Sequence, residues 1–333
     1  MTRRQITTVA AILTTAVVVF LGGAGFYFAG QIYSGAFALD RPAPGVVPAR
    51  DVYSDPSAFG ASFTTESVPC GGGSCPDWFV PAAGTPDDTW AVLVHGRGAG
   101  RTEPLRALTA LHEAGIPALD ISYRNDNDAP EDPSHRYEYG RTEWHDLAAA
   151  VDHAQAAGAR RILLFGSSMG GAIVAAFLAQ APAAETGLVS GIILDAPMLD
   201  LDATIDWQAG ERSLPMVGLP IPGVLTGTAK WIADHRYHLG LAGLDHLPGA
   251  WLHVPALVFH GTADPTVPIA TSDRFTAAHP RLVTEVRVPG AAHVASWNAD
   301  PKAYDAAVHQ FLSRTVGGAA PPTPDPGQVG GAD

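Results

Sequence analysis

A serine stands between two glycines in the segment Gly166-Ser167-Ser168-Met169-Gly170, which has the pattern G-x-S-x-G. The apolar run Ile162 to Phe165 precedes this segment, and an alanine-rich stretch with helical periodicity runs from Gly170 to Gln180. The order predicts a strand, a tight turn and a helix, in which small neighbours let strand and helix approach each other around a strained residue. We therefore interpret Ser168 as a nucleophile whose hydroxyl is lifted clear of a sheet. The plainer alternative is a glycine-rich turn with a serine N-cap.

An aspartate and a histidine follow two later predicted strands. Asp264 comes after the apolar run Ala256 to His260, and His293 comes after the run Leu282 to Val288. Because ligand and catalytic groups of such sheets gather beyond the carboxyl ends of the strands, we expect both side chains to converge there with Ser168. The histidine would accept the serine proton and the aspartate would orient the imidazole, which is the chemistry of acyl transfer.

Other residues compete for two of these roles. Asp195 also ends a predicted strand and is the alternative to Asp264 as the orienting acid. We interpret His260 as a structural histidine at the end of a strand and His309 as a surface residue of a helix. The sequence around these residues contains no cluster of metal ligands, and the chemistry needs none, so we expect no metal or organic cofactor.

Four motifs together resemble the α/β-hydrolase superfamily. They are the G-x-S-x-G segment, the His95-Gly96 loop, His260-Gly-Thr-Ala-Asp264-x-x-Val-Pro268 and Gly290-Ala-Ala-His293. The resemblance covers roughly residues 61–314, and within the superfamily the chain is most similar to the monoacylglycerol lipase, lysophospholipase and serine aminopeptidase-like branch. This resemblance implies the α/β-hydrolase fold and an oxyanion hole formed by the main-chain N–H groups of Arg97 and Met169.

Strands and helices alternate through residues 61–315, which predicts one α/β domain with a doubly wound, mostly parallel sheet. Residues 203–252 depart from this alternation, and we expect them to form a small cap inserted over the active site. Apolar residues of the cap are candidates to line an acyl pocket, although packing of the cap onto the main domain explains the same pattern. The candidates are Trp207, Met216, Leu219, Ile221, Val224, Leu225 and Trp231.

The segment Ile6 to Gly30 contains no charged side chain and, at about 1.5 Å per residue, is long enough to cross a bilayer as one transmembrane helix. Arg3 and Arg4 precede it, so the positive-inside rule predicts a single-pass protein of the cell membrane, with residues 1–5 cytoplasmic and the domain extracytoplasmic. A cleaved signal peptide with a site at Ala36-Phe37-Ala38 is the alternative. The aromatic residues expected at the outer interface are Phe26, Tyr27, Phe28 and Tyr33.

The remaining segments are expected to connect and brace the domain. Residues 31–60, which include the proline-containing stretch Arg41 to Asp55, predict an extended tether, and residues 316–333 predict a disordered tail. Cys70 and Cys75, the only cysteines, flank a glycine-rich hairpin tip and are expected to form a disulfide in an exported domain. Two free thiols are the alternative if the domain is not exported.

Composition limits the class of function. The chain of 333 residues has a formal net charge of −13, which would repel nucleic acid. We therefore expect a membrane-anchored extracytoplasmic serine hydrolase that cleaves carboxylic esters, with lipid-derived acyl esters among the candidate small-molecule substrates. A serine peptidase of the aminopeptidase-like type is the second hypothesis. A non-catalytic binding module on a hydrolase fold is the third, because a fold does not by itself establish an activity.

Overall fold

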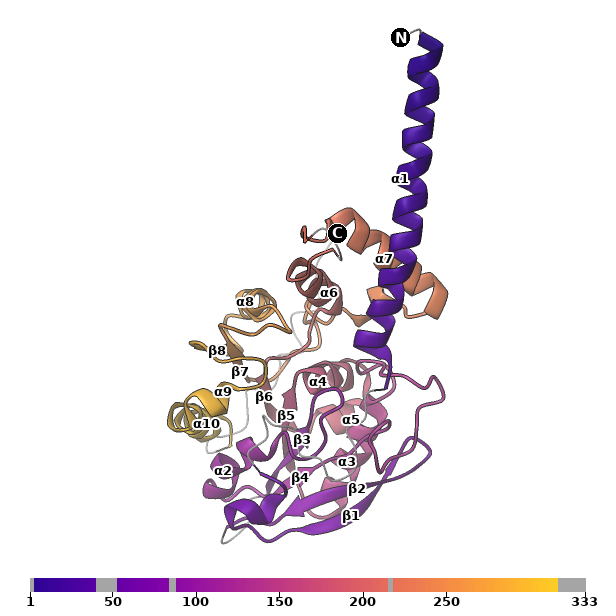
Figure 1. Cartoon of the computed structure of the whole chain (residues 1–333). Helices are drawn as coiled ribbons and strands as arrows, with labels where there is room; N and C mark the ends of the chain where they lie inside the picture. The colour runs from indigo at the N-terminus through magenta and orange to yellow at the C-terminus, as the bar shows by residue number, and fades with distance from the viewer. Residues whose placement is uncertain (1–2, 40–52, 84–87, 215–217, 317–333) are drawn as a thin grey trace, which may run out of the picture.

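An eight-stranded sheet lies at the centre of the part of the chain that the computed structural model describes, which is residues 3–39, 53–83, 88–214 and 218–316 (Figure 1). Its strands are β1 (Thr64–Cys70), β2 (Gly73–Val80), β3 (Thr89–Val94), β4 (Ala118–Asp120), β5 (Arg161–Ser167), β6 (Val189–Asp195), β7 (Ala256–Gly261) and β8 (Val283–Val288). They lie in the order β1-β2-β4-β3-β5-β6-β7-β8. β2 pairs antiparallel with β1 and β4, and all other neighbours are parallel.

Helices cover both faces of the sheet. Those of one face include α3 (Trp144–Ala156) and α4 (Met169–Gln180), and those of the other include α2 (Leu105–Glu113) and α10 (Pro301–Thr315). Successive residues of β3 enter opposite cores, because Val92 packs in the cluster of α3 and α4 whereas Leu93 packs in that of α2 and α10. Strands buried on both faces are for this reason nearly continuous apolar runs. The predicted α/β class with a doubly wound, mostly parallel sheet is confirmed.

The insertion between β6 and β7 forms the cap. It contains α6 (Leu201–Gly210) and α7 (Gly223–Tyr237), which lie on the side of the sheet from which the amino-terminal helix projects (Figure 1). Residues 215–217 of this insertion, including Met216, lie outside the described residues. The other short helices of the domain are α5 (Ala183–Thr186), α8 (Ile269–Ala278) and α9 (Ser296–Ala299).

A disulfide closes the hairpin of β1 and β2. Cys70 and Cys75 are joined, with their Cα atoms 5.7 Å apart, as the exported-domain interpretation expects. The turn between the strands has positive φ angles of +54° at Gly71 and +81° at Gly72. Glycine adopts this left-handed conformation without the Cβ clash of other residues, so the glycine-rich tip is what lets the two strands pair up to the turn.

The amino-terminal helix α1 (Arg3–Ile32) projects far beyond the domain (Figure 1). Among the described residues, only the stretch Arg4–Phe37 is long and apolar enough to cross a membrane, and 6% of its most apolar window is buried. The exposed amino-terminal part of α1 therefore has the composition of a membrane span. Its carboxyl-terminal part packs along α7, and Tyr33, the residue directly after α1, stacks on Tyr237.

The predicted extended tether is wrong at residues 31–39. A π-helical turn, Tyr33–Phe37, continues α1 directly, and Ala38 then forms a β-bridge to the domain. The Phe37 ring is fully buried and meets the Tyr139 ring edge-on, at 5.4 Å between centroids. Burial of this aromatic side chain holds the end of α1 against the domain, and that contact is with a residue distant in sequence.

Residues 53–60 also pack on the domain rather than forming part of a tether. Pro56–Phe59 is a short 3-10 helix, and Tyr53 lies against the rings of Phe59 and Trp297. The middle of the predicted tether, residues 40–52, and the predicted tail after residue 316 lie outside the described residues.

The approach of α4 to β3 leads to a test of the fold. A methyl group at Gly170 would clash with the carbonyl oxygens of Val94 and His95, coming within 2.8 Å of the latter. We expect Gly170→Ala to lower the free energy of unfolding by about 3 kcal/mol, since the backbone itself would have to move. The helical Gly227 has no heavy atom within 4 Å of its added methyl group, so Gly227→Ala should instead stabilise by about 0.5–1 kcal/mol. Denaturant unfolding of both variants checks this, and equal stabilities would contradict the close approach.

Candidate active site

Ser168 occupies a strained turn between β5 and α4. Its φ is +49° and its ψ is −117°, a conformation that costs a non-glycine residue about 1–3 kcal/mol. Neighbouring backbone holds the turn in place, because the Ser168 N–H donates to the Asp195 carbonyl at 3.0 Å and the Met198 N–H donates to the Ser168 carbonyl at 2.9 Å. Backbone hydrogen bonds thus hold the turn against β6 and the segment that follows it, and the Ser168 side chain lines a cavity.

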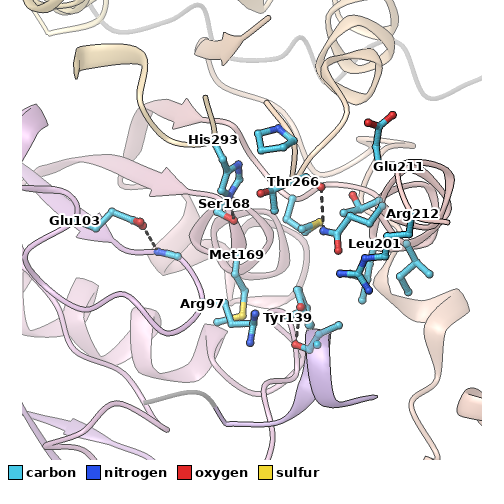
Figure 2. A pocket seen from close by; sticks show the side chains of 18 residues that line it. Arg97, Glu103, Tyr139, Ser168, Met169, Leu201, Glu211, Arg212, Thr266 and His293 are labelled. Atoms are coloured by element: carbon cyan, nitrogen blue, oxygen red, sulfur yellow. Dashed lines mark hydrogen bonds between the residues drawn. The ribbon is translucent and has the colours of Figure 1, made fainter. Parts of the chain in front are cut away.

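The structure brings together the three residues that the sequence placed after separate strands. His293 Nε2 lies 2.9 Å from Ser168 Oγ, and His293 Nδ1 lies 2.7 Å from Asp264 Oδ2. Figure 2 shows the His293 ring pointing at Ser168. The imidazole therefore bridges the hydroxyl and the carboxylate, which is the arrangement needed to pass a proton from the serine.

The Asp264 carboxylate is held in its ionised form. Its second oxygen, Oδ1, accepts hydrogen bonds from the N–H groups of Thr266 at 2.7 Å and Val267 at 3.0 Å. Burial opposes ionisation, but the hydrogen bonds from His260 and His293 outweigh it and lower the pKa of Asp264 well below its usual range. An ionised carboxylate against Nδ1 favours the tautomer whose Nε2 can accept the serine proton.

His260 supports this carboxylate from behind. It is fully buried, as expected of a structural histidine, with Nδ1 2.7 Å from Ser272 Oγ and Nε2 3.4 Å from Asp264 Oδ2. The predicted surface residue His309 lies on α10 and approaches Glu113 at 3.1 Å. Neither histidine approaches Ser168, so His293 alone of the three lies against the serine.

Asp195, the alternative candidate for the orienting acid, is hydrogen-bonded to a serine and not to the His293 imidazole. Its Oδ1 accepts a hydrogen bond from the Ser296 hydroxyl at 2.7 Å, and its side chain is fully buried. Burial raises the pKa of the Asp195 carboxyl to about 6. The structure therefore places Asp264, and not Asp195, against the His293 imidazole.

The loop after β3 lines the cavity with Gly96 and Arg97 and contains a buried acid that sequence reasoning missed. Glu103 Oε1 accepts the Gly96 N–H at 2.6 Å and the Ser167 hydroxyl at 2.7 Å, and its side chain is almost fully buried. These two hydrogen bonds tie the loop to the residue before Ser168. The sequence signal was weak, because a single glutamate after a glycine-rich loop is usually a surface residue.

The expected oxyanion donors are the main-chain N–H groups of Arg97, which follows Gly96, and of Met169, which follows Ser168. Both residues line the cavity that contains Ser168. Within the described part of the chain, the main-chain N–H of neither residue donates to a protein oxygen. The Tyr123 hydroxyl donates to the His95 carbonyl at 3.0 Å, which helps to fix the loop that carries Arg97.

The cavity at Ser168 has a volume of about 470 Å³ and a mixed lining (Figure 2). Leu201 and Ile205 of α6 supply apolar surface, and Glu211 and Arg212 supply charge. Gly35 and Ala36, from the turn that continues α1, also line it; the sequence analysis did not assign them to the site. Among the described residues, no group of three or more His, Cys, Asp or Glu side chains is placed to hold a metal ion.

None of the six predicted acyl-pocket candidates that the structure describes lines this cavity. Leu219, Val224 and Trp231 are more than 60% exposed and lie on the outer surface of the cap, and Trp207 is 40% exposed. Leu225 is buried in packing, and Ile221 lines an adjoining cavity instead. The sequence left pocket lining and packing open as alternatives, because an apolar cap residue suits the pocket, packing or an outer surface equally well and local sequence does not separate these cases.

Comparisons with known proteins agree with this fold. Residues 141–234, which contain Ser168, match the family model described as serine aminopeptidase, S33. The uncharacterized protein Rv2307c of Mycobacterium tuberculosis is 26% identical over 247 residues, covering 72% of this chain and 75% of its own length. The uncharacterized protein YfhR of Salmonella typhimurium is 25% identical over 229 residues, covering 65% of this chain and 69% of its own.

Solved structures show the same architecture at low sequence identity. The esterase Pf2001 of Pyrococcus furiosus matches with a TM-score of 0.61 and 18% identity, covering 83% of this chain and 99% of that one. Est1E of Butyrivibrio proteoclasticus matches with a TM-score of 0.52 and 17% identity, covering 76% and 99%. The protein therefore has the α/β-hydrolase fold, and its residues 141–234 match the family model described as serine aminopeptidase, S33.

Proposed function

We propose that the protein is a membrane-anchored, extracytoplasmic serine hydrolase that cleaves carboxylic esters. The observation that carries this proposal is the hydrogen-bonded series Ser168–His293–Asp264 at the carboxyl ends of β5, β7 and β8. A binding module would have no need for a strained serine, a bridging imidazole and an ionised carboxylate in this order. The non-catalytic hypothesis is therefore the weakest of the three.

In the proposed reaction, Ser168 Oγ attacks the acyl carbonyl while His293 Nε2 takes the hydroxyl proton. The carbonyl oxygen becomes an oxyanion that accepts hydrogen bonds from the N–H groups of Arg97 and Met169. Collapse of this intermediate breaks the ester bond, and His293 returns the proton to the departing alcohol. A water molecule then repeats the sequence on the acyl-enzyme and releases the carboxylic acid, which restores the Ser168 hydroxyl. Asp264 stabilises the charged imidazole throughout.

Three features support an anchored domain outside the cytoplasm. The exposed part of α1 is apolar, and the arginines before it favour a cytoplasmic amino terminus. The Cys70–Cys75 disulfide belongs to an oxidising compartment. Cleavage at Ala36-Phe37-Ala38 is disfavoured, since the Tyr139 hydroxyl donates to the Ala36 carbonyl and the Phe37 ring is buried in the domain.

A peptidase acting near an amino end remains the second candidate. The observation that favours it is the Glu211 side chain in the lining of the Ser168 cavity, because a carboxylate there is suited to a substrate ammonium group. Parallel assays with acyl esters and aminoacyl amides distinguish the two reactions, and a Glu211→Gln variant should lower turnover of the amides alone if the peptidase hypothesis is correct.

Covalent labelling tests the nucleophile. We expect a fluorophosphonate probe to label the full-length protein, because the activated Ser168 hydroxyl attacks phosphorus as it would an acyl carbonyl. Ser168→Ala should abolish labelling. Ser190→Ala is the matched control, since the Ser190 hydroxyl donates to the Ile162 carbonyl within the sheet and should leave labelling intact. Labelling that persists in Ser168→Ala would show that the nucleophile is misassigned.

A pair of aspartate variants tests the orienting acid. We expect Asp264→Asn to lower kcat by about 10⁴-fold, since an amide against His293 Nδ1 favours the wrong imidazole tautomer. Asp195→Asn should lower kcat far less, because the Asp195 side chain bonds Ser296 and only its main-chain carbonyl contacts Ser168. Steady-state kinetics on one ester with both variants checks this, and a larger loss for Asp195→Asn would reverse the assignment.

Variants of Glu103 test the support of the oxyanion loop. We expect Glu103→Ala to lower kcat by about 10²–10³-fold with little change in KM, because the loop that carries the Arg97 N–H loses its fixed position. Glu103→Gln should recover part of the activity, since its amide oxygen can still accept the Gly96 N–H. The free energy of unfolding of each variant is measured as the control. A lower stability with an unchanged kcat per folded molecule would show that Glu103 has only a structural role.

A further inference from the structure

The apolar exposed length of α1 is shorter than a bilayer is thick. Ile6 to Phe20 is exposed throughout, and contact with the rest of the protein begins at Leu21. This free length is about 22 Å at 1.5 Å per residue, whereas the hydrocarbon core of a bilayer is about 30 Å thick. If the hydrocarbon core of the bilayer begins near Ile6, it extends about five residues beyond Phe20, to the level of Gly25.

At that level α1 is in contact with the cap. A Cβ atom at Gly25 would lie 2.9 Å from the Thr228 side chain and 3.0 Å from that of Ile232, so a glycine is what allows α7 to approach α1 here. One residue later, the Arg236 guanidinium lies 4.6 Å from the Phe26 ring. The anchor therefore holds α7 at the boundary between the hydrocarbon and the outer head groups.

The outer surface of the cap has the composition that this boundary requires. Val224 and Trp231 of α7 are 63% and 62% exposed and stand seven residues apart, on one face of the helix. Leu219, in the loop before α7, is 62% exposed. Tryptophan is enriched at membrane interfaces, and exposed apolar side chains that gather on one surface mark sites of contact with a membrane or another protein. The cap is thus suited to lie on the bilayer that α1 crosses.

A second cavity lies between α1 and the cap and adjoins the first. It is lined by Phe28 and Ile32 of α1 and by Ile221, Thr226 and Ala229 of the cap, and we call it the α1–cap groove. It shares five lining residues with the Ser168 cavity, and they come from both sides of the groove. These are Gly35, Ala36, Ile205, Gln208 and Arg212. The two cavities therefore adjoin along the turn that ends α1 and along one side of α6.

We propose that the α1–cap groove is the acyl-binding channel through which a fatty-acyl ester enters from the bilayer. The acyl chain lies in the groove against α1, its ester carbonyl reaches Ser168 past the shared residues Gln208 and Arg212, and the polar alcohol group lies in the Ser168 cavity. The membrane anchor then forms one wall of the active site as well as attaching the protein. This inference rests on the proposed hydrolase function and adds the substrate class and its route.

A photo-crosslinking phosphonate tests the channel directly. Full-length protein in phosphatidylcholine vesicles is treated with a long-chain alkyl fluorophosphonate that carries a diazirine near the end of the chain, then irradiated, and crosslinked peptides are identified by mass spectrometry. We expect the phosphonate on Ser168 and the crosslink on α1, at or near Phe28 and Ile32. Phosphonate on Ser168 with crosslinks only outside α1 and the groove would overturn the channel alone. No phosphonate on Ser168 would overturn the proposed function and the channel together.

In the same assay, a bulky substitution tests the route. Ile221→Trp narrows the groove at a position that does not line the Ser168 cavity. For each variant, the labelling rate with the long-chain phosphonate is divided by the labelling rate with a short-chain phosphonate. We expect Ile221→Trp to lower this ratio by at least tenfold. Ala156→Trp, on the exposed face of α3, is the matched control and should leave this ratio unchanged. An equal ratio in the Ile221 variant and the control would overturn the channel, because both rates are measured at the same serine.

Discussion

The site depends on the close approach of β5 and α4 around Ser168. β5 approaches α4 this closely because Gly166 lacks a side chain, and α4 approaches β3 because Gly170 lacks one. Ser168 joins β5 to α4 in a strained conformation with a positive φ. The strain is offset by hydrogen bonds to Asp195 and Met198, at the end of the neighbouring strand. Since β5, β7 and β8 are all parallel, their carboxyl ends meet at one edge and present the serine, the aspartate and the histidine to a single cavity.

Buried acids around this turn show how local hydrogen bonding divides similar residues into different roles. Asp264 and Asp195 both lie at the ends of parallel strands, and both are buried. Two main-chain N–H groups and two histidines stabilise the Asp264 carboxylate, so its pKa falls, whereas Asp195 has one serine partner and its pKa rises to about 6. Both carboxyl groups are buried, but Asp264 is ionised against the His293 imidazole, whereas Asp195 is a weaker acid that is hydrogen-bonded to a serine of α9.

Helix α1 is part of the domain as well as an extension from it. Its end continues through a π-helical turn into the buried Phe37, and Gly35 and Ala36 reach the cavity of Ser168. If α1 crosses the membrane, the packing of α1 on the domain sets the position of the bilayer relative to the active site, and a flexible linker does not. A hydrolase arranged in this way would have little freedom to act on distant substrates, and lipids beside its own anchor would be the nearest ones.

Local sequence determined those parts of the protein whose physics is local. Apolar runs, glycine positions and turn chemistry identified the strand–serine–helix segment, the disulfide hairpin, the long apolar helix and the alternation that gives a doubly wound sheet. The chain order of serine, aspartate and histidine also followed from residues at strand ends. Each strand, turn and helix in these patterns is recognised from a short run of consecutive residues, and the alternation and the order of the three residues follow from the sequence of those runs.

Tertiary structure decided the rest, because those outcomes depend on contacts between residues far apart in the chain. In the folded chain Asp264, and not Asp195, lies against His293. Glu103 is hydrogen-bonded to the loop that carries Arg97, and Trp231 is exposed on the outside of the cap. Tertiary structure also replaced the first part of the predicted tether with a docked helix end. Periodicity shows that a side chain is apolar or a loop is polar, but the partner it meets is fixed only when distant segments pack together.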